Sequence, residues 1–155
     1  MKTERRSMLK KFVLSALGFA GLRSLANAEI ISGEQHAEVS GIVTDQDVPL
    51  FSASTKFGNL VFIAGQGAHY SGDIKAHTET VLQALEKELI KVGSSMNNVL
   101  KVNVYLNDIA DYDGMNSIYR GRFGSKPPVR TTVAVAKGGV PGNSLVEMDC
   151  IAYIP

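Results

Sequence analysis

The segment Leu145–Ile154 constrains the fold most strongly, because apolar side chains occur there at every second residue. Val146, Met148, Cys150, Ala152 and Ile154 share one face, and Glu147 and Asp149 fall on the other. The preceding residues 137–144 contain three glycines and a proline and are predicted to form a loop. Before that loop, 129–136 is rich in β-branched residues. The C-terminus therefore reads as two strands joined by a glycine-rich loop.

Arg130 lies on the first of these two strands and shares a face with Thr132, because side chains repeat every two residues along a strand. We expect this face to be the same one that carries Glu147. A guanidinium and a carboxylate would then point into one space, which suits recognition of a small polar molecule.

Three further strands and two helices are predicted upstream. The strands are Phe51–Lys56, Leu60–Ala64 and Asn97–Leu106. The first helix spans Lys75–Val92, and the second starts at Asp108 or Asp111 and continues to about Phe123. The order β-β-α-β-α-β-β predicts an α+β fold with one antiparallel or mixed sheet and both helices on one face. The other face, mixing alanines, an isoleucine and a tyrosine with an arginine, suits a subunit interface with the site at its boundary.

The first 28 residues read as a targeting peptide. Arg5-Arg6 precede an apolar run at Phe12–Leu22, and Ala26-Asn27-Ala28 supplies a small-x-small cleavage site. These features resemble a twin-arginine export signal, with an ordinary secretory signal or an uncleaved anchor as alternatives. We expect a periplasmic protein that has no membrane segment after cleavage, with an N-terminal tail over 29–48 and one folded domain over 49–155.

Removal of the leader changes the charge of the chain. The 155 residues carry a formal charge of +1, but six Lys or Arg and one Glu lie in residues 1–28. Residues 29–155 hold 10 basic and 14 acidic residues, a formal charge of −4. This balance argues against a nucleic-acid partner, which requires a basic surface. Cys150 is the only cysteine, which excludes an intrachain disulfide, and its apolar face predicts a buried thiol.

Several runs of residues occur in a characteristic order between Pro49 and Ile154. They are Gly58-Asn59 with Phe62-Ile63-Ala64-Gly65-Gln66, Gly93-Ser94-Ser95 with Val99–Leu106, Asp111–Phe123, and Pro127–Arg130 with Val146-Glu147-Met148-Asp149. As an ordered set they resemble the RidA/YjgF family of enamine/imine deaminases. The resemblance implies a chorismate-mutase-like fold and a homotrimer with clefts between its subunits.

The resemblance also implies a reaction: hydrolysis of 2-imino acids such as 2-iminobutanoate or 2-iminopropanoate, or of their enamine tautomers, to 2-oxo acids and ammonia. It implies no metal and no organic cofactor. Arg130 would grip the substrate carboxylate and Glu147 would position the attacking water. Gly65 and Thr132 would orient the substrate, and Asn116 would support the backbone near the cleft.

The chain departs from the family at three positions. Phe51 stands where a tyrosine is common, Ala64 where a serine is common, and Thr132 where a cysteine is frequent. Phe51 keeps an aromatic wall of the substrate site, and both Phe51 and Ala64 lack a hydroxyl. This loss leaves a second interpretation open, a non-catalytic binder of small 2-oxo or carboxylate metabolites. RNA cleavage or translation inhibition, a third activity attributed to such proteins, is opposed by the charge of −4 and by export. The three histidines have no metal-ligand spacing with a cysteine or an acidic pair.

Overall fold

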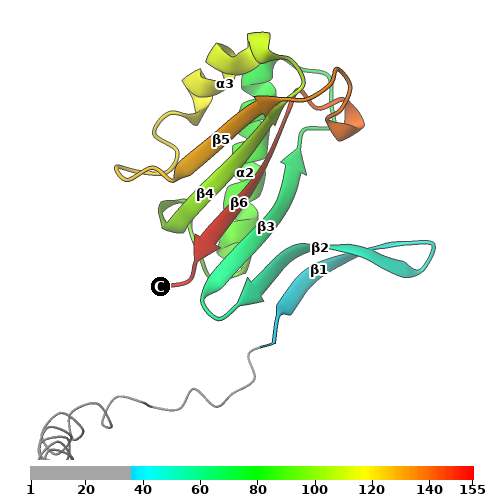
Figure 1. Cartoon of the computed structure of the whole chain (residues 1–155), viewed down its shortest axis with the longest axis vertical. Coiled ribbons are helices and arrows are strands. Elements are labelled where there is room, and N and C mark those ends of the chain that lie inside the picture. Colours follow the sequence, from blue (N-terminus) through cyan, green and yellow to red (C-terminus); the bar gives the residue numbers. More distant parts are fainter. Residues whose placement is uncertain (1–35) are drawn as a thin grey trace, which may run out of the picture. The chain divides into compact units, whose positions relative to one another are not determined.

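The computed structural model describes residues 36–155 (Figure 1), so the predicted signal peptide at 1–28 lies outside the described residues. The elements are β1 (Glu38–Asp45), β2 (Val48–Phe57), β3 (Leu60–Gly67), α2 (Ile74–Lys91), β4 (Val99–Leu106), α3 (Tyr112–Tyr119), β5 (Val129–Ala134) and β6 (Val146–Tyr153), with short 3-10 turns at Met96–Asn98, Ile109–Asp111 and Pro141–Asn143.

The six strands form one mixed sheet in the order β1-β2-β3-β6-β4-β5. All neighbouring strands run antiparallel except β4 and β5, which are parallel. The parallel pair results from the crossover through α3, which returns the chain to the same end of the sheet. The predicted mixed sheet with two helices is confirmed.

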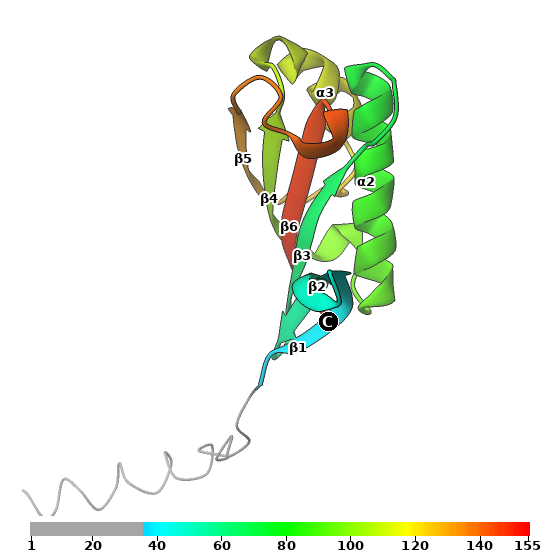
Figure 2. The same cartoon turned by 90° about the vertical axis from the view of Figure 1, so that its right-hand side faces the viewer.

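Both helices cover one face of the sheet, as the edge-on view in Figure 2 shows. The apolar stripe of α2 buries Val81, Leu82, Leu85 and Leu89 against this face. The side chains that the sheet contributes to the same core are Val61, Ile63, Val99, Val102, Val104, Leu106, Val146, Met148, Cys150 and Ala152. The alternation read from Leu145–Ile154 therefore marks the helix-covered face, and Glu147 and Asp149 lie on the open face.

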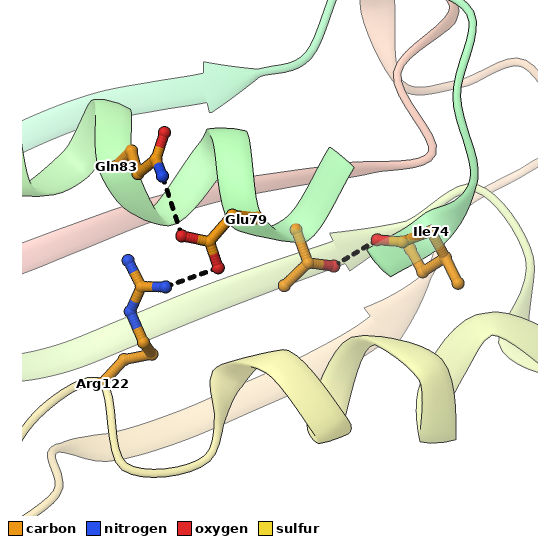
Figure 3. Close-up of polar contacts among 5 residues, drawn as sticks. Ile74, Glu79, Gln83 and Arg122 are labelled. Atoms are coloured by element: carbon orange, nitrogen blue, oxygen red, sulfur yellow. Dashed lines mark hydrogen bonds and ion pairs between the residues drawn. The ribbon is translucent and has the colours of Figure 1, made fainter. Parts of the chain in front are cut away.

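The segment that follows α3 is tied to α2 by an ion pair. Arg122 Nη1 lies 2.7 Å from Glu79 Oε2, and Gln83 Nε2 donates to Glu79 Oε1 at 2.8 Å (Figure 3). The hydrogen bond from Arg122 lowers the pKa of the Glu79 carboxyl. On the same helix, the Thr78 hydroxyl donates to the Ile74 carbonyl at 2.7 Å. The ion pair between Arg122 and Glu79 helps hold α3, which carries part of the candidate site, beside α2.

β1 lies inside the predicted tail 29–48, so the folded domain begins before residue 49, and several element boundaries also differ from the expectation. The second helix ends at Tyr119, not near Phe123, because Arg120 is extended at ψ 128° and Gly121 turns the chain with φ +80°. At the N-terminal side, the predicted strand Phe51–Lys56 begins earlier, at Val48, because it pairs with β1 as a hairpin.

Cys150 is buried in the core, at 2% exposure, as predicted. Burial raises the pKa of its thiol to about 12, with a further contribution from the charge of Asp149. Among residues 36–155, no helix is long and apolar enough to cross a membrane.

Candidate active site

Arg130 lies on the helix-covered side of the sheet. On β5 it stands opposite Val102, a fully buried residue of β4, and residues paired in this way share a face. Its Nη1 donates to Asn116 Oδ1 at 2.8 Å and its Nη2 to the Tyr112 hydroxyl at 3.2 Å. The guanidinium carbon lies 4.7 Å from the ring centre of Tyr119. Because β5 is an edge strand, the long side chain reaches α3 without entering the core.

The expectation that Arg130 and Glu147 share a face within one chain is wrong. Glu147 lies opposite Tyr105 of β4, whereas Arg130 lies opposite Val102, three residues earlier on the same strand. An odd separation along a strand places the two side chains on opposite faces. The sequence of β5, VRTTVA, has no apolar alternation that could have fixed its orientation.

A cavity of about 490 Å³ opens beside Arg130. We call it the Arg130 pocket; its lining residues are Asp113, Asn116, Ser117, Tyr119, Arg120 and Arg130. Tyr119 is 9% exposed, and its hydroxyl has no hydrogen-bond partner within residues 36–155. Burial raises the pKa of Tyr119 to about 12, against the opposing charge of Arg130. The pocket therefore presents a fixed cation, which suits a carboxylate ligand, beside a tyrosine whose hydroxyl oxygen is itself buried.

Thr132 also lies on this side, opposite the buried Val104. Its hydroxyl oxygen is buried and has no hydrogen-bond partner within the described part of the chain. Asn116 was expected to support the backbone near the cleft, but its side chain instead holds Arg130. The arginine is thus fixed by α3, the element next to β5.

Glu147 lies on the open face and lines a second cavity, of about 190 Å³. We call it the Glu147 pocket; its lining residues are Tyr105, Val135, Gly139, Val140, Pro141 and Glu147. Glu147 makes no hydrogen bond or ion pair within residues 36–155. A half-buried carboxylate without a partner is free to bind water or substrate.

Gly65 brings the β3 backbone against Glu147. It lies with Ala64 in an irregularity between Ile63 and Gln66, where β3 loses register with β6. A Cβ placed on Gly65 would collide with the Glu147 carboxyl oxygen and lie 2.9 Å from its Cδ. The absence of a side chain at Gly65 therefore creates the space that the Glu147 carboxylate occupies.

Phe51 belongs to the same side as Glu147. Ser54 of β2 is buried at 4% and faces the helices opposite Ile63, so alternation places Phe51 on the open side. Its ring is 53% exposed. The predicted site residues therefore separate into two groups: Arg130, Thr132 and Asn116 on the helix side, and Glu147, Gly65 and Phe51 on the open side.

Three tyrosines adjoin these groups but were not predicted as site residues. Tyr112 and Tyr119 contact Arg130, and Tyr105 lines the Glu147 pocket. Helical spacing indicates that Tyr112 and Tyr119 share a face with Asn116, which was the available signal. The sequence carries no such signal for Tyr105, because its position in the alternation of β4 is that of any exposed strand residue.

His77 is buried, and both nitrogens of its ring are hydrogen-bonded to backbone groups. Its Nδ1 accepts the Leu145 backbone N–H at 3.0 Å, so its Nε2 donates to the Tyr70 carbonyl, also at 3.0 Å. Both ring nitrogens are occupied in joining α2 to two loops. No group of three or more His, Cys, Asp or Glu residues that could hold a metal occurs within 36–155.

The fold and the pockets define an α+β domain with an arginine beside an open cavity and an unpaired carboxylate on the opposite face of the same sheet. The family described as Endoribonuclease L-PSP matches residues 46–154. A RutC family protein of Pyrococcus abyssi is 39% identical over 110 residues, which cover 66% of this chain and 85% of that protein. The chloroplastic Reactive Intermediate Deaminase A of Arabidopsis thaliana is 33% identical over 67% of this chain and 58% of its own length.

A solved structure agrees with the sequence matches. A Mycobacterium tuberculosis member of the YjgF/YER057c/UK114 family is 26% identical, with a TM-score of 0.66 over 77% of this chain and 100% of that one. The chain belongs to the RidA/YjgF family, as its sequence motifs predict.

Proposed function

We propose that this protein is a hydrolytic deaminase that converts 2-imino acids and their enamine tautomers to 2-oxo acids and ammonia. The observation that carries the proposal is the Arg130 pocket, where Asn116 and Tyr112 fix a guanidinium at the edge of an open cavity. A planar guanidinium pairs two N–H groups with a carboxylate, which every 2-imino acid carries. The name of the Arabidopsis relative, Reactive Intermediate Deaminase A, favours this reaction class.

We further propose that the complete site forms between two copies of the chain, in a homotrimer. Arg130 and Glu147 lie on opposite faces of one sheet, so one substrate can meet both only if they come from different chains. The open face favours association because it exposes large apolar side chains, including Phe62 at 42%, Val129 at 70% and Val133 at 44%. The partner's Glu147 pocket would then lie against the Arg130 pocket.

The proposed chemistry needs only a carboxylate and water. Water attacks the carbon of the protonated imine; a C–O bond forms, the C=N π electrons move to nitrogen, and one water proton passes to Glu147, which gives a neutral carbinolamine. Glu147 then returns this proton to the nitrogen, and the C–N bond breaks as ammonia departs. The oxygen lone pair forms the C=O bond and the hydroxyl proton passes to Glu147, so the protonated imino acid and water become oxo acid, ammonia and one proton. Phe51, Ala64, Gly65 and Thr132 would shape and orient the substrate.

The test is an assay with the purified full chain. An amino-acid oxidase generates 2-iminopropanoate, and semicarbazide traps whatever imine remains; the protein is expected to lower the trapped amount in proportion to its concentration. No acceleration across a panel of 2-imino acids would reject the deaminase. If calorimetry instead shows that 2-oxobutanoate binds, that binding requires Arg130, and that no turnover occurs, the protein is a non-catalytic binder. This is the alternative that the missing hydroxyls at Phe51 and Ala64 leave open.

Gly65→Ala is expected to lower kcat/KM about tenfold to a hundredfold, because the new methyl group moves the Glu147 carboxylate out of place. The colliding atoms are the end of a flexible side chain, so the free energy of unfolding should change by less than about 1 kcal/mol. The measurements are steady-state kinetics and urea denaturation.

Gly67→Ala provides a control on the same strand. Gly67 pairs with Glu147 across the β3–β6 ladder, but the three atoms nearest to a Cβ at Gly67 belong to the exposed His69, at 3.1 Å and 3.4 Å, and to Ser144, at 3.5 Å. Equal activities of the two variants would show that Gly65 does not position the carboxylate.

The sequence of residues 1–28 further supports a proposal of export to the periplasm by the twin-arginine route. The imino acids would then arise outside the cytoplasm, for example by oxidation of amino acids. Replacement of Arg5-Arg6 by two lysines with unchanged export would reject that route.

A further inference from the structure

Asn103, Tyr105 and Asp149 form a polar cluster on the open face, at the centre of the sheet. Asn103 and Tyr105 belong to β4 and Asp149 to β6, the two strands paired side by side. Asn103 Nδ2 donates to Asp149 Oδ1 at 2.8 Å, and the Tyr105 hydroxyl donates to Asp149 Oδ2 at 3.2 Å. Each carboxylate oxygen thus receives one donor, so the amide fixes the carboxylate that orients the tyrosine.

The direction of these hydrogen bonds leaves the Tyr105 oxygen with free acceptor capacity. An ionised carboxylate only accepts, so the single hydroxyl proton of Tyr105 is committed to Asp149. Burial, followed by the charge of Asp149, raises the pKa of Tyr105, which keeps the phenol neutral. The lone pairs of the oxygen can still accept a hydrogen bond from a third group.

Tyr105 and Glu147 are direct neighbours across the β4–β6 ladder. Both line the Glu147 pocket, whose remaining wall is the segment from Val135 to Pro141. The charge of Glu147 also contributes to the raised pKa of Tyr105, so the carboxylate lies within electrostatic reach of the hydroxyl. Two acceptors, one charged and one neutral, therefore border the same small space.

We infer that Tyr105 is a second water-positioning residue, accepting one O–H of the attacking water while Glu147 accepts the other. A water molecule that donates both protons presents an oxygen lone pair to the imine carbon, which is the orientation that attack requires. This inference rests on the proposed deaminase function and assigns a role to the Asn103–Tyr105–Asp149 cluster. Asp149 and Asn103 act through Tyr105 and do not touch the substrate.

The test compares full-chain wild type with Tyr105→Phe, which removes the hydroxyl and keeps the ring. We expect kcat for imine hydrolysis to fall about ten- to a hundredfold while KM stays within about twofold, because carboxylate binding at Arg130 is unaffected. Tyr70→Phe is the matched control: it removes a hydroxyl that bonds Thr80 at 2.9 Å, away from the Glu147 pocket, and should leave kcat unchanged.

Asp149→Asn provides an independent variant that keeps the size of the side chain. The amide oxygen would accept from Asn103 and its NH2 group would donate to the Tyr105 oxygen, so the Tyr105 proton loses its acceptor and turns toward the pocket, where the hydroxyl becomes a donor to water and no longer an acceptor. The expected effect is again a lower kcat at unchanged KM.

The outcomes separate the inference from the function on which it rests. Wild-type kcat in both Tyr105→Phe and Asp149→Asn, with an inactive Glu147→Gln, would overturn the role of Tyr105 and leave the deaminase intact. A lower thermal midpoint with unchanged kinetics would assign the cluster to sheet stability alone, which also rejects the inference. A wild-type chain that does not hydrolyse imino acids would overturn both.

Discussion

Arg130→Lys is expected to lower kcat/KM for 2-iminopropanoate by about a hundredfold, and Arg130→Ala by about a thousandfold, which corresponds to about 4 kcal/mol of transition-state stabilisation. Lysine keeps the charge but presents a point ammonium, which cannot bond Asn116, Tyr112 and a substrate carboxylate in one plane. Steady-state kinetics with both variants measure the effect.

Arg122→Lys provides the matched control. It makes the same substitution at an arginine that pairs with Glu79 on α2 and does not line the Arg130 pocket. Its kcat/KM should remain near the wild-type value. An Arg130→Lys variant with wild-type kinetics would contradict the proposed bidentate binding of the substrate carboxylate by Arg130. It would indicate that positive charge alone matters.

Mixing two inactive variants is expected to restore activity. Chains carrying Arg130→Ala or Glu147→Gln are mixed in equal amounts in denaturant and refolded together. If each site takes its arginine from one chain and its glutamate from another, about a quarter of the sites in a random trimer contain both native residues. The mixture should therefore recover about a quarter of wild-type activity.

Two controls accompany this mixing experiment. Each variant refolded alone should stay inactive, and refolded wild type sets the recoverable maximum. A mixture as inactive as its components, with a trimer present by sedimentation, would mean that both residues of a site come from one chain. That result would contradict the geometry of the sheet, on which Arg130 and Glu147 face opposite ways.

The fold was largely predictable because its burial pattern is regular. Leu145–Ile154 and Lys75–Val92 each show one unbroken period, and the structure buries the expected faces of both. Such patterns report directly which side chains leave water. The end of α3 was harder to predict, because Gly121 terminates the helix through its own backbone conformation while apolar residues continue to Phe123.

The residues of the candidate site were proposed from sequence motifs, and their arrangement was not predictable. Arg130 and Glu147 are recognisable by type and motif, yet the orientation of β5 depends on its register with β4, which a short edge strand does not encode. The cluster of Asn103, Tyr105 and Asp149 was hidden for a related reason. It joins residues 44 and 46 positions apart, and only strand pairing reveals that they meet.

The buried Cys150 has a consequence for a protein expected in an oxidising compartment. With a thiol pKa of about 12 and 2% exposure, the side chain holds almost no thiolate at neutral pH and presents no surface to another thiol. Disulfide exchange between copies of the chain requires a thiolate and an accessible sulfur atom, so the folded protein is protected from covalent cross-linking. The only sulfhydryl of the chain becomes reactive when the sheet opens, and its reactivity can then report the integrity of the fold.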